Sequence, residues 1–208
     1  FPFDQAKSVL TQFARFTETM PDDLNVWMVT RKAPSLPFLP EDVHGKEIVA
    51  LAVCYVGDPT AGEKLIEPLR GFGSAHGEHI GVIDAIIDYA GTLPSPQCEI
   101  FIGTIRGQTA RVAPDAMAYS SRDANYVMNV HGRWETAAED ERGIAWARQF
   151  FAKSRPFASS GAYINFLTQD ETDRIAFAYG ATYNRLVALK KKYDPTNLFR
   201  MNQNIKPA

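Results

Sequence analysis

Two strand-like stretches lie near the start of the chain with no helical pattern between them, NVWMVTRKA at 25–33 and EIVALAVCYVGD at 47–58. The first alternates apolar and polar residues, and the second is more continuously apolar and ends at a Gly-Asp pair. The segment between them, PSLPFLPEDVHGK, contains three prolines and is typical of a loop. Neighbouring strands joined by such a loop pair antiparallel, so this stretch predicts an antiparallel sheet.

Amphipathic helical patterns flank these strands, and two further strand patterns follow later in the chain. The helical patterns cover residues 4–19, 60–71, 82–93, 139–154 and 174–193, and the later strand patterns cover 97–105 and 125–134. Neither a repeat nor a low-complexity tract interrupts this order. The sequence therefore predicts an α+β fold, an antiparallel β-sheet covered by helices on one face.

Composition excludes several classes of partner. A formal charge of −2 over 208 residues argues against nucleic acid or an anionic membrane surface as the main partner, because both favour a basic protein surface. No apolar run approaches the ~18 residues that a membrane-spanning helix needs. We therefore expect neither nucleic acid nor membrane among the partners.

Familiar catalytic motifs are absent from the sequence. It contains no GxGxxG after a strand, no GxxxxGK[ST] and no GxSxG. His76 and His79 flank Glu78, but the glycines around them predict a flexible loop, whereas a metal site needs ligands on a rigid scaffold. We therefore predict no metal site. These residues alone indicate an α+β domain without a defined activity.

A long ordered pattern near the end of the chain changes that interpretation. AYGATYNRLVALKKKYDPTNLFRMNQNI at 178–205 resembles the C-terminal part of the berberine bridge enzyme-like family of FAD-linked oxidases. Shorter supporting matches are FPFDQA, PLRGFG, SRDANYVMNVHGRW and RPFASSGAYINF. The resemblance implies a substrate-binding α+β domain at 1–160, apparently shortened near 74–81, and a berberine-bridge-like segment at 161–208 that contacts a flavin domain.

The resemblance also implies the cofactor and the chemistry. FAD would be held mainly by an N-terminal domain that lies outside this sequence, and the chain would be one piece of a longer parent, inactive when isolated. The implied reaction moves a hydride from an alcohol, a sugar or a related substrate to the flavin, with O₂ as the electron acceptor. The implied partners are the small-molecule substrate, O₂ and the FAD domain of the same parent.

Tyr163 matches the tyrosine that the family uses as its base. A free tyrosine has a pKa of ~10, so removing its proton at pH 7 costs about 4 kcal/mol, which the site must offset. If residues 161–166 form a strand, Asn165 alternates onto the same face as Tyr163 and contacts the flavin with it. Near the C-terminus, the resemblance implies that Asn202, Gln203 and Asn204 offer their amides to the polar edge of the flavin. The alternative for these amides is a plain capping peptide.

Three further positions are candidates for contact with the substrate. Asn129 matches a polar position that faces the substrate in relatives, and is otherwise a solvated amide. Glu99 either reaches the floor of the pocket or is an edge glutamate in solvent. Arg122 either contacts an acidic substrate or has a structural role.

A different class of function remains open at this point. The chain is alternatively a stand-alone domain that binds a small molecule or another protein without catalysis. An apolar face left open by the missing flavin domain would then favour a homodimer. The sequence leaves the compartment undecided, with the cytoplasm the expected one.

Overall fold

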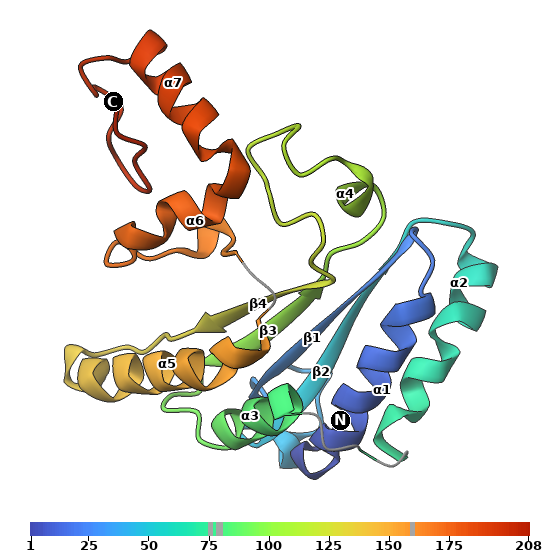
Figure 1. Cartoon of the computed structure of the whole chain (residues 1–208). Helices are drawn as coiled ribbons and strands as arrows, with labels where there is room; N and C mark the ends of the chain where they lie inside the picture. The colour runs from blue at the N-terminus through green and yellow to red at the C-terminus, as the bar shows by residue number, and fades with distance from the viewer. Residues whose placement is uncertain (75–76, 78–80, 159–160) are drawn as a thin grey trace. The chain divides into compact units, whose positions relative to one another are not determined.

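The computed structural model describes residues 1–74, 77, 81–158 and 161–208. The chain forms two compact units. Unit 1 comprises Phe1–Thr104 with Met128–Ala158, and unit 2 comprises Ile105–Val127 with Ser159–Ala208. Figure 1 shows the helices and strands of each unit. Residues 105–127 thus group with the C-terminal residues. The predicted division into 1–160 and 161–208 followed the family resemblance and stays a prediction.

A four-stranded sheet organises unit 1, in the order β2-β1-β3-β4. The strands are β1 (Leu24–Lys32), β2 (Glu47–Tyr55), β3 (Glu99–Thr104) and β4 (Tyr126–His131). β1 pairs antiparallel with both β2 and β3. The predicted antiparallel sheet is thus confirmed.

The helices of unit 1 are α1 (Ala6–Thr19), α2 (Pro59–Ile66), α3 (Gly81–Ala90) and α5 (Asp140–Ser154). Shorter 3-10 segments lie at Phe3–Gln5, Glu41–Val43, Glu67–Ser74, Ala137–Glu139 and Arg155–Phe157. The predicted helix at 60–71 continues as a 3-10 helix after Ile66 because Pro68 lacks the backbone N–H that an α-helix needs.

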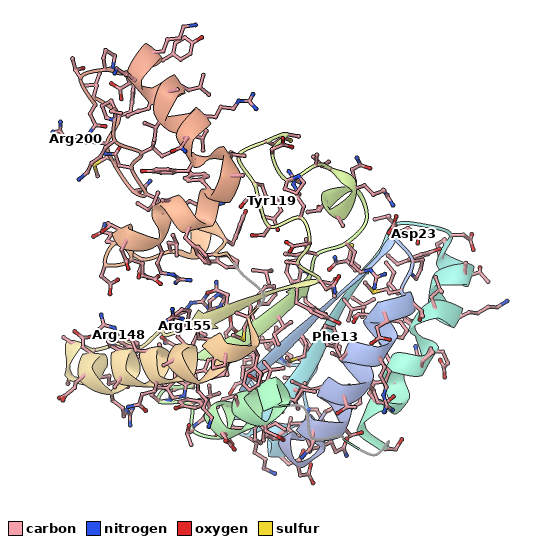
Figure 2. All side chains as sticks on the ribbon, in the orientation of Figure 1. Phe13, Asp23, Tyr119, Arg148, Arg155 and Arg200 are labelled. Carbon is pink, nitrogen blue, oxygen red and sulfur yellow. The ribbon has the colours of Figure 1, made fainter. Side chains whose placement is uncertain are left out.

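One face of the sheet carries the hydrophobic core. Along β1, Val26 and Met28 are fully buried among α1, α3 and α5, whereas Trp27 between them is 49% exposed. Phe13 of α1, labelled in Figure 2, lies in the same core. Because side chains alternate across a strand, the second face of the sheet presents Trp27 and its neighbours instead. We call this second face the open face, and it carries a cluster of polar side chains that includes Glu99 and His131.

Unit 2 contains α4 (Gln108–Arg111), α6 (Ile175–Tyr179) and α7 (Tyr183–Tyr193), with 3-10 segments at Ile164–Phe166, Thr172–Arg174 and Gly180–Thr182. Its small core consists of Leu167, Ile175 and Ala178, against which Ile205 of the tail packs. The predicted continuous helix at 174–193 is wrong, because Gly180 has φ +51° and ends α6. A glycine adopts this left-handed conformation without a side-chain clash, and α7 then begins in a new direction.

Two predictions remain outside what the structure tests. The shortened segment near 74–81 and the His-Gly-Glu-His stretch include residues 75, 76 and 78–80, which lie outside the described residues. Across the described part of the chain, none of the helices has the length and apolar character needed to cross a membrane.

Candidate active site

Tyr163 lies at the surface of unit 2 and contacts the side chains of Asn165 and Phe166. It directly precedes the 3-10 turn Ile164–Phe166, and the Asn165 side-chain amide donates a hydrogen bond of 3.0 Å to the Tyr163 hydroxyl oxygen. The Phe166 ring meets the Tyr163 ring edge to face, with 4.8 Å between ring centroids. Tyr163 remains 37% exposed. The Tyr163 side chain is therefore held by two contacts and remains partly exposed.

The predicted strand at 161–166 is absent: residues 161–163 have no regular structure, and Ile164–Phe166 form a 3-10 turn. Asn165 nevertheless lies beside Tyr163, as predicted, because the tight turn brings a side chain two residues away back onto the hydroxyl. The proximity is confirmed, but its cause is the turn and not strand alternation.

Tyr119, labelled in Figure 2, lies on the loop between β3 and β4. It contacts Tyr163, which belongs to the other chain segment of unit 2. The two rings are 6.1 Å apart at an interplanar angle of 76°. Burial raises the pKa of Tyr119, the nearby Arg122 guanidinium acts in the opposite direction, and Tyr163 adds to the rise. Tyr119 therefore stays protonated at neutral pH.

Arg122 lies beneath Tyr119 and is buried. Its Nε donates to the Tyr119 carbonyl oxygen and its Nη1 to the Thr109 carbonyl oxygen, both at 3.1 Å. The guanidinium carbon lies 4.7 Å from the centroid of the Tyr119 ring, within the range of a cation–π contact. These contacts give Arg122 a positioning role toward Tyr119, and its predicted contact with substrate stays a prediction.

Gly161 lets these two segments of unit 2 approach each other. Its φ is +81°, and a Cβ built there would lie 2.7 Å from the Ser121 hydroxyl oxygen. Only glycine meets both conditions without strain. We call Tyr119, Arg122, Tyr163, Asn165 and Phe166 the tyrosine cluster.

A second polar group lies on the open face of unit 1, around Glu99. One carboxylate oxygen, Oε2, pairs with Arg31 Nη1 at 3.2 Å, and the other, Oε1, pairs with Arg133 Nη1 at 3.3 Å. The Glu99 side chain is only 12% exposed. Two guanidinium groups compensate its charge, so Glu99 is neither an isolated base nor an edge glutamate in open solvent.

His131 connects Glu99 to Asn129. Its Nδ1 lies 2.6 Å from Glu99 Oε1, and its Nε2 lies 2.8 Å from the side-chain nitrogen of Asn129. The imidazole stacks at 6.3 Å on Phe101, with only 4° between the ring planes. Phe101 in turn meets Trp27 edge to face at 5.1 Å. We call Arg31, Glu99, Asn129, His131 and Arg133 the sheet-face cluster.

Sequence reasoning missed His131. The available signal was its spacing: Asn129 and His131 lie two residues apart on one strand and therefore on one face. Glu99 and Asn129, both predicted as site residues, are brought together through it. Tyr163 and Asn165 are brought together in unit 2.

The C-terminal amides differ in their environments. Gln203 donates from Nε2 to the Leu167 carbonyl oxygen at 2.7 Å, which ties the tail to the core of unit 2. Asn202 is exposed and has φ +57°. The side-chain oxygen of Asn204 is buried and accepts no hydrogen bond. Gln203 thus has a structural contact, whereas Asn204 offers an unused acceptor.

The turn before these amides is fastened by Asp194. Its carboxylate accepts hydrogen bonds from the backbone N–H of Leu198 at 2.7 Å and of Phe199 at 3.0 Å, and pairs with Lys190. The hydrogen bond from Lys190 is the main cause that lowers the pKa of Asp194. The turn presents Leu198, Phe199 and Met201, each at least 70% exposed. Such a set of exposed large apolar side chains marks a packing surface.

Metal chemistry has no support among the described residues, since no three His, Cys, Asp or Glu side chains gather in the described ranges in a way that would hold an ion. The two clusters are instead built from hydrogen-bonding, aromatic and paired charged groups. Their chemistry suits the orientation of an organic substrate and the acceptance of a proton.

Comparison with known proteins places the tyrosine residue and the C-terminal amides in one family segment. Residues 162–206 match the family model described as berberine and berberine like. This part of the chain therefore resembles the berberine and berberine-like family segment. The matched segment includes Tyr163, Asn165 and all three C-terminal amides.

Proteins similar to this chain include an FAD-linked oxidoreductase and a berberine bridge enzyme-like protein. It is 31% identical over 61% of its length to an FAD-linked oxidoreductase of Dictyostelium discoideum, covering 27% of that protein. It is 28% identical over 61% of its length to the berberine bridge enzyme-like protein C-1 of Nicotiana tabacum, covering 28% of it. The matched part is thus about a quarter of each curated relative.

Solved structures with a similar fold carry the same family name. The structure of the berberine bridge enzyme-like 1 protein of Physcomitrella patens matches 99% of this chain with a TM-score of 0.77 at 14% identity. The match covers 52% of that protein, so the chain spans about half the length of this solved relative. At this identity the likeness shows the fold alone, an α+β arrangement with an antiparallel sheet.

Proposed function

We propose that this chain is the substrate-binding and flavin-contacting part of an FAD-dependent oxidase. The whole protein would transfer a hydride from an alcohol, a sugar or a related substrate to the flavin and pass the electrons to O₂. The observation that carries the proposal is the family match over residues 162–206, inside which Tyr163 has an exposed hydroxyl fixed by Asn165.

The residues present fit a flavin ring in charge and in hydrogen bonding. The Asn204 side-chain oxygen is buried without a donor, and a ring N–H of a flavin is a donor of the kind that would satisfy it. Asn165, Asn202 and Asn204 would hold the ring, with the rest of FAD bound by other parts of the parent. When bound, FAD supplies hydride acceptance and reactivity toward O₂.

Tyr163 would take the proton of the substrate hydroxyl as the hydride leaves the adjacent carbon. A tyrosine accepts a proton in its phenolate form, and Asn165 donates a hydrogen bond that positions the Tyr163 oxygen. Phe166 and Tyr119 flank the ring and limit its rotation. The tyrosine cluster therefore contributes a positioned proton acceptor, a role that typically accelerates a reaction about 10²- to 10⁴-fold.

The sheet-face cluster would orient the substrate. Asn129 presents an amide on the open face, and Trp27 and Phe101 supply aromatic surface beside it. Glu99 would act there through His131 and the two arginines, because its oxygens are already paired. Arg122 would act mainly through Tyr119.

The exposed apolar turn of Leu198, Phe199 and Met201 supports contact between the C-terminal segment and the flavin domain of the parent. The same surface would otherwise favour a homodimer. Burial of these three side chains against the flavin domain would stabilise the parent by roughly 1.5–3 kcal/mol each.

The test is anaerobic mixing of the natural protein, isolated with its flavin, with a panel of alcohols and sugars. We expect at least one of them to bleach the oxidised flavin, and air to restore the colour with formation of hydrogen peroxide. A flavin that stays oxidised with every compound would contradict hydride transfer from this substrate class. Recovery of the colour only with an acceptor other than O₂ would contradict the oxidase assignment.

A further inference from the structure

We propose that Glu99 and His131 are positioning residues that fix the side-chain amide of Asn129, so that its carbonyl oxygen is the atom offered to a ligand on the open face. The ligand class that follows is one with a hydrogen-bond donor, such as a hydroxyl group. The role in substrate selection rests on the proposed function, whereas the fixed amide does not.

The first step is the tautomer of His131. A carboxylate only accepts hydrogen bonds, so the 2.6 Å contact between Glu99 Oε1 and His131 Nδ1 requires the proton on Nδ1. Arg133 Nη2 also lies 3.0 Å from Nδ1, and because arginine only donates, a hydrogen bond there would need a lone pair on Nδ1. That lone pair would face the Glu99 carboxylate oxygen at 2.6 Å, where two acceptors repel each other. The contact with Glu99 therefore decides the tautomer, and Arg133 serves the carboxylate instead.

The second step is the orientation of the Asn129 amide. With the proton on Nδ1, the Nε2 of the neutral imidazole is an acceptor. Asn129 must then direct its NH₂ group at Nε2, 2.8 Å away. Its carbonyl oxygen is left for another donor. Because Met128 and Val130 pack into the core, Asn129 between them lies on the open face.

The third step is what holds the imidazole. Phe101 stacks on it with nearly parallel planes, and Glu99 is itself fixed by Arg31 from β1 and by Arg133 beyond β4. Stacking and the hydrogen bond to Nδ1 together allow one ring orientation. The imidazole thus transmits the position of the carboxylate to the amide.

Protonation of the imidazole inverts the amide. An imidazolium carries an N–H at both nitrogens, so Asn129 must turn to present its oxygen to Nε2 and its NH₂ group to the ligand. The groups that face the imidazole are Glu99, which favours its charged form, and Arg31 and Arg133, which oppose it. The ligand that fits then changes from a donor to an acceptor.

The test uses the ¹⁵N-labelled natural protein that contains this chain, prepared without flavin, and follows the side-chain amide signals of Asn129 by NMR. In His131→Phe, which keeps a flat ring against Phe101 but removes both nitrogens, we expect the Asn129 amide protons to shift and to exchange faster with water. Gln97, whose amide donates to Glu135 at 3.0 Å, is the matched control and should not change. An Asn129 signal that is the same in both proteins would overturn the proposal.

Binding of two small probes gives the second measurement. Cyclohexanol carries a donor and cyclohexanone only an acceptor, and they are otherwise alike. We expect the Asn129 signal to respond to cyclohexanol at about two- to tenfold lower concentration, the value of one hydrogen bond. The preference should disappear in His131→Phe. Equal responses to the two probes, or no response to either, would overturn the ligand class.

Acidification of the unmodified chain tests the same point without a substitution. As the ring carbons of His131 report protonation, the preference should reverse toward cyclohexanone. A preference for cyclohexanol that persists on the protonated ring would contradict the inversion. Because the chain is free of flavin throughout, failure of the oxidase assignment would leave these outcomes unchanged. Failure of the Asn129 proposal would likewise leave the flavin-reduction test unchanged.

Discussion

The side-chain amide of Asn165 donates a hydrogen bond to the hydroxyl oxygen of Tyr163 at 3.0 Å. The contact joins the residue before a 3-10 turn to a residue inside that turn, within the segment that matches the berberine family model. It gives the Tyr163 hydroxyl oxygen a hydrogen-bond donor, and the proposed proton acceptor is the phenolate form of this residue.

Substitution of Tyr163 by Phe is expected to slow flavin reduction in the natural protein by about 10²- to 10⁴-fold, because the proton acceptor is lost and the ring remains. Tyr193→Phe is the control, since Tyr193 is 73% exposed on the last turn of α7. Rapid-mixing measurement of flavin bleaching checks both variants. Equal rates in the natural protein and in Tyr163→Phe would remove Tyr163 from the chemistry.

Substitution of Arg122 by Gln is expected to destabilise unit 2 by about 2–3 kcal/mol, because two partly buried carbonyl oxygens lose charged donors and Tyr119 loses its cation–π contact. Arg70→Gln is the control: its ion pair with Glu67 is exposed and contributes at most about 1 kcal/mol. Chemical denaturation measures both. A raised KM for substrate with unchanged stability would instead support the predicted substrate contact of Arg122.

Substitution of Gly161 by Ala is expected to cost about 1–3 kcal/mol, since the backbone has φ +81° and the new Cβ would meet the Ser121 hydroxyl. Gly71→Ala is the matched control, because a Cβ at Gly71 meets nothing within 4 Å. The free energy of unfolding distinguishes them. Restoring part of the loss with Ser121→Gly would separate the steric contribution from the conformational one.

Acid is expected to loosen the turn that Asp194 holds. The pKa of Asp194 is lowered in the folded chain, chiefly by Lys190, so its contribution to stability is present above its unfolded value and is lost as the pH falls below about 4. Amide hydrogen exchange at Leu198 and Phe199 should accelerate through this range after correction for intrinsic rates. In Asp194→Asn the exchange should be fast at neutral pH too. Exchange in the natural chain that does not respond to acid would contradict the role of the carboxylate.

Local patterns predicted the elements of this fold better than their assembly. The strands at β1 and β2 followed from alternation and a proline-rich loop, and they do pair antiparallel. That β1 also pairs with β3, more than sixty residues later, depends on packing that no local pattern reports. The break at Gly180 was missed because apolar spacing on both sides of it fits one helix, whereas a positive φ leaves no trace in that spacing.

The site shows the same limit. Tyr163 and Asn165 were predicted from a family resemblance and are in contact, although the turn that joins them was predicted as a strand. His131 was missed because its role depends on two residues of the neighbouring strand, Glu99, which contacts its Nδ1, and Phe101, which stacks on its ring. Such partners are defined by sheet register, which a single sequence does not report.

The most direct test of the flavin account is the intact mass and the visible absorption of the protein purified from its natural source. The account predicts a yellow flavoprotein whose chain is longer than these 208 residues and includes them. A colourless protein of only these residues would contradict it, and the assignments of Tyr163 and the C-terminal amides to flavin chemistry would fall with it.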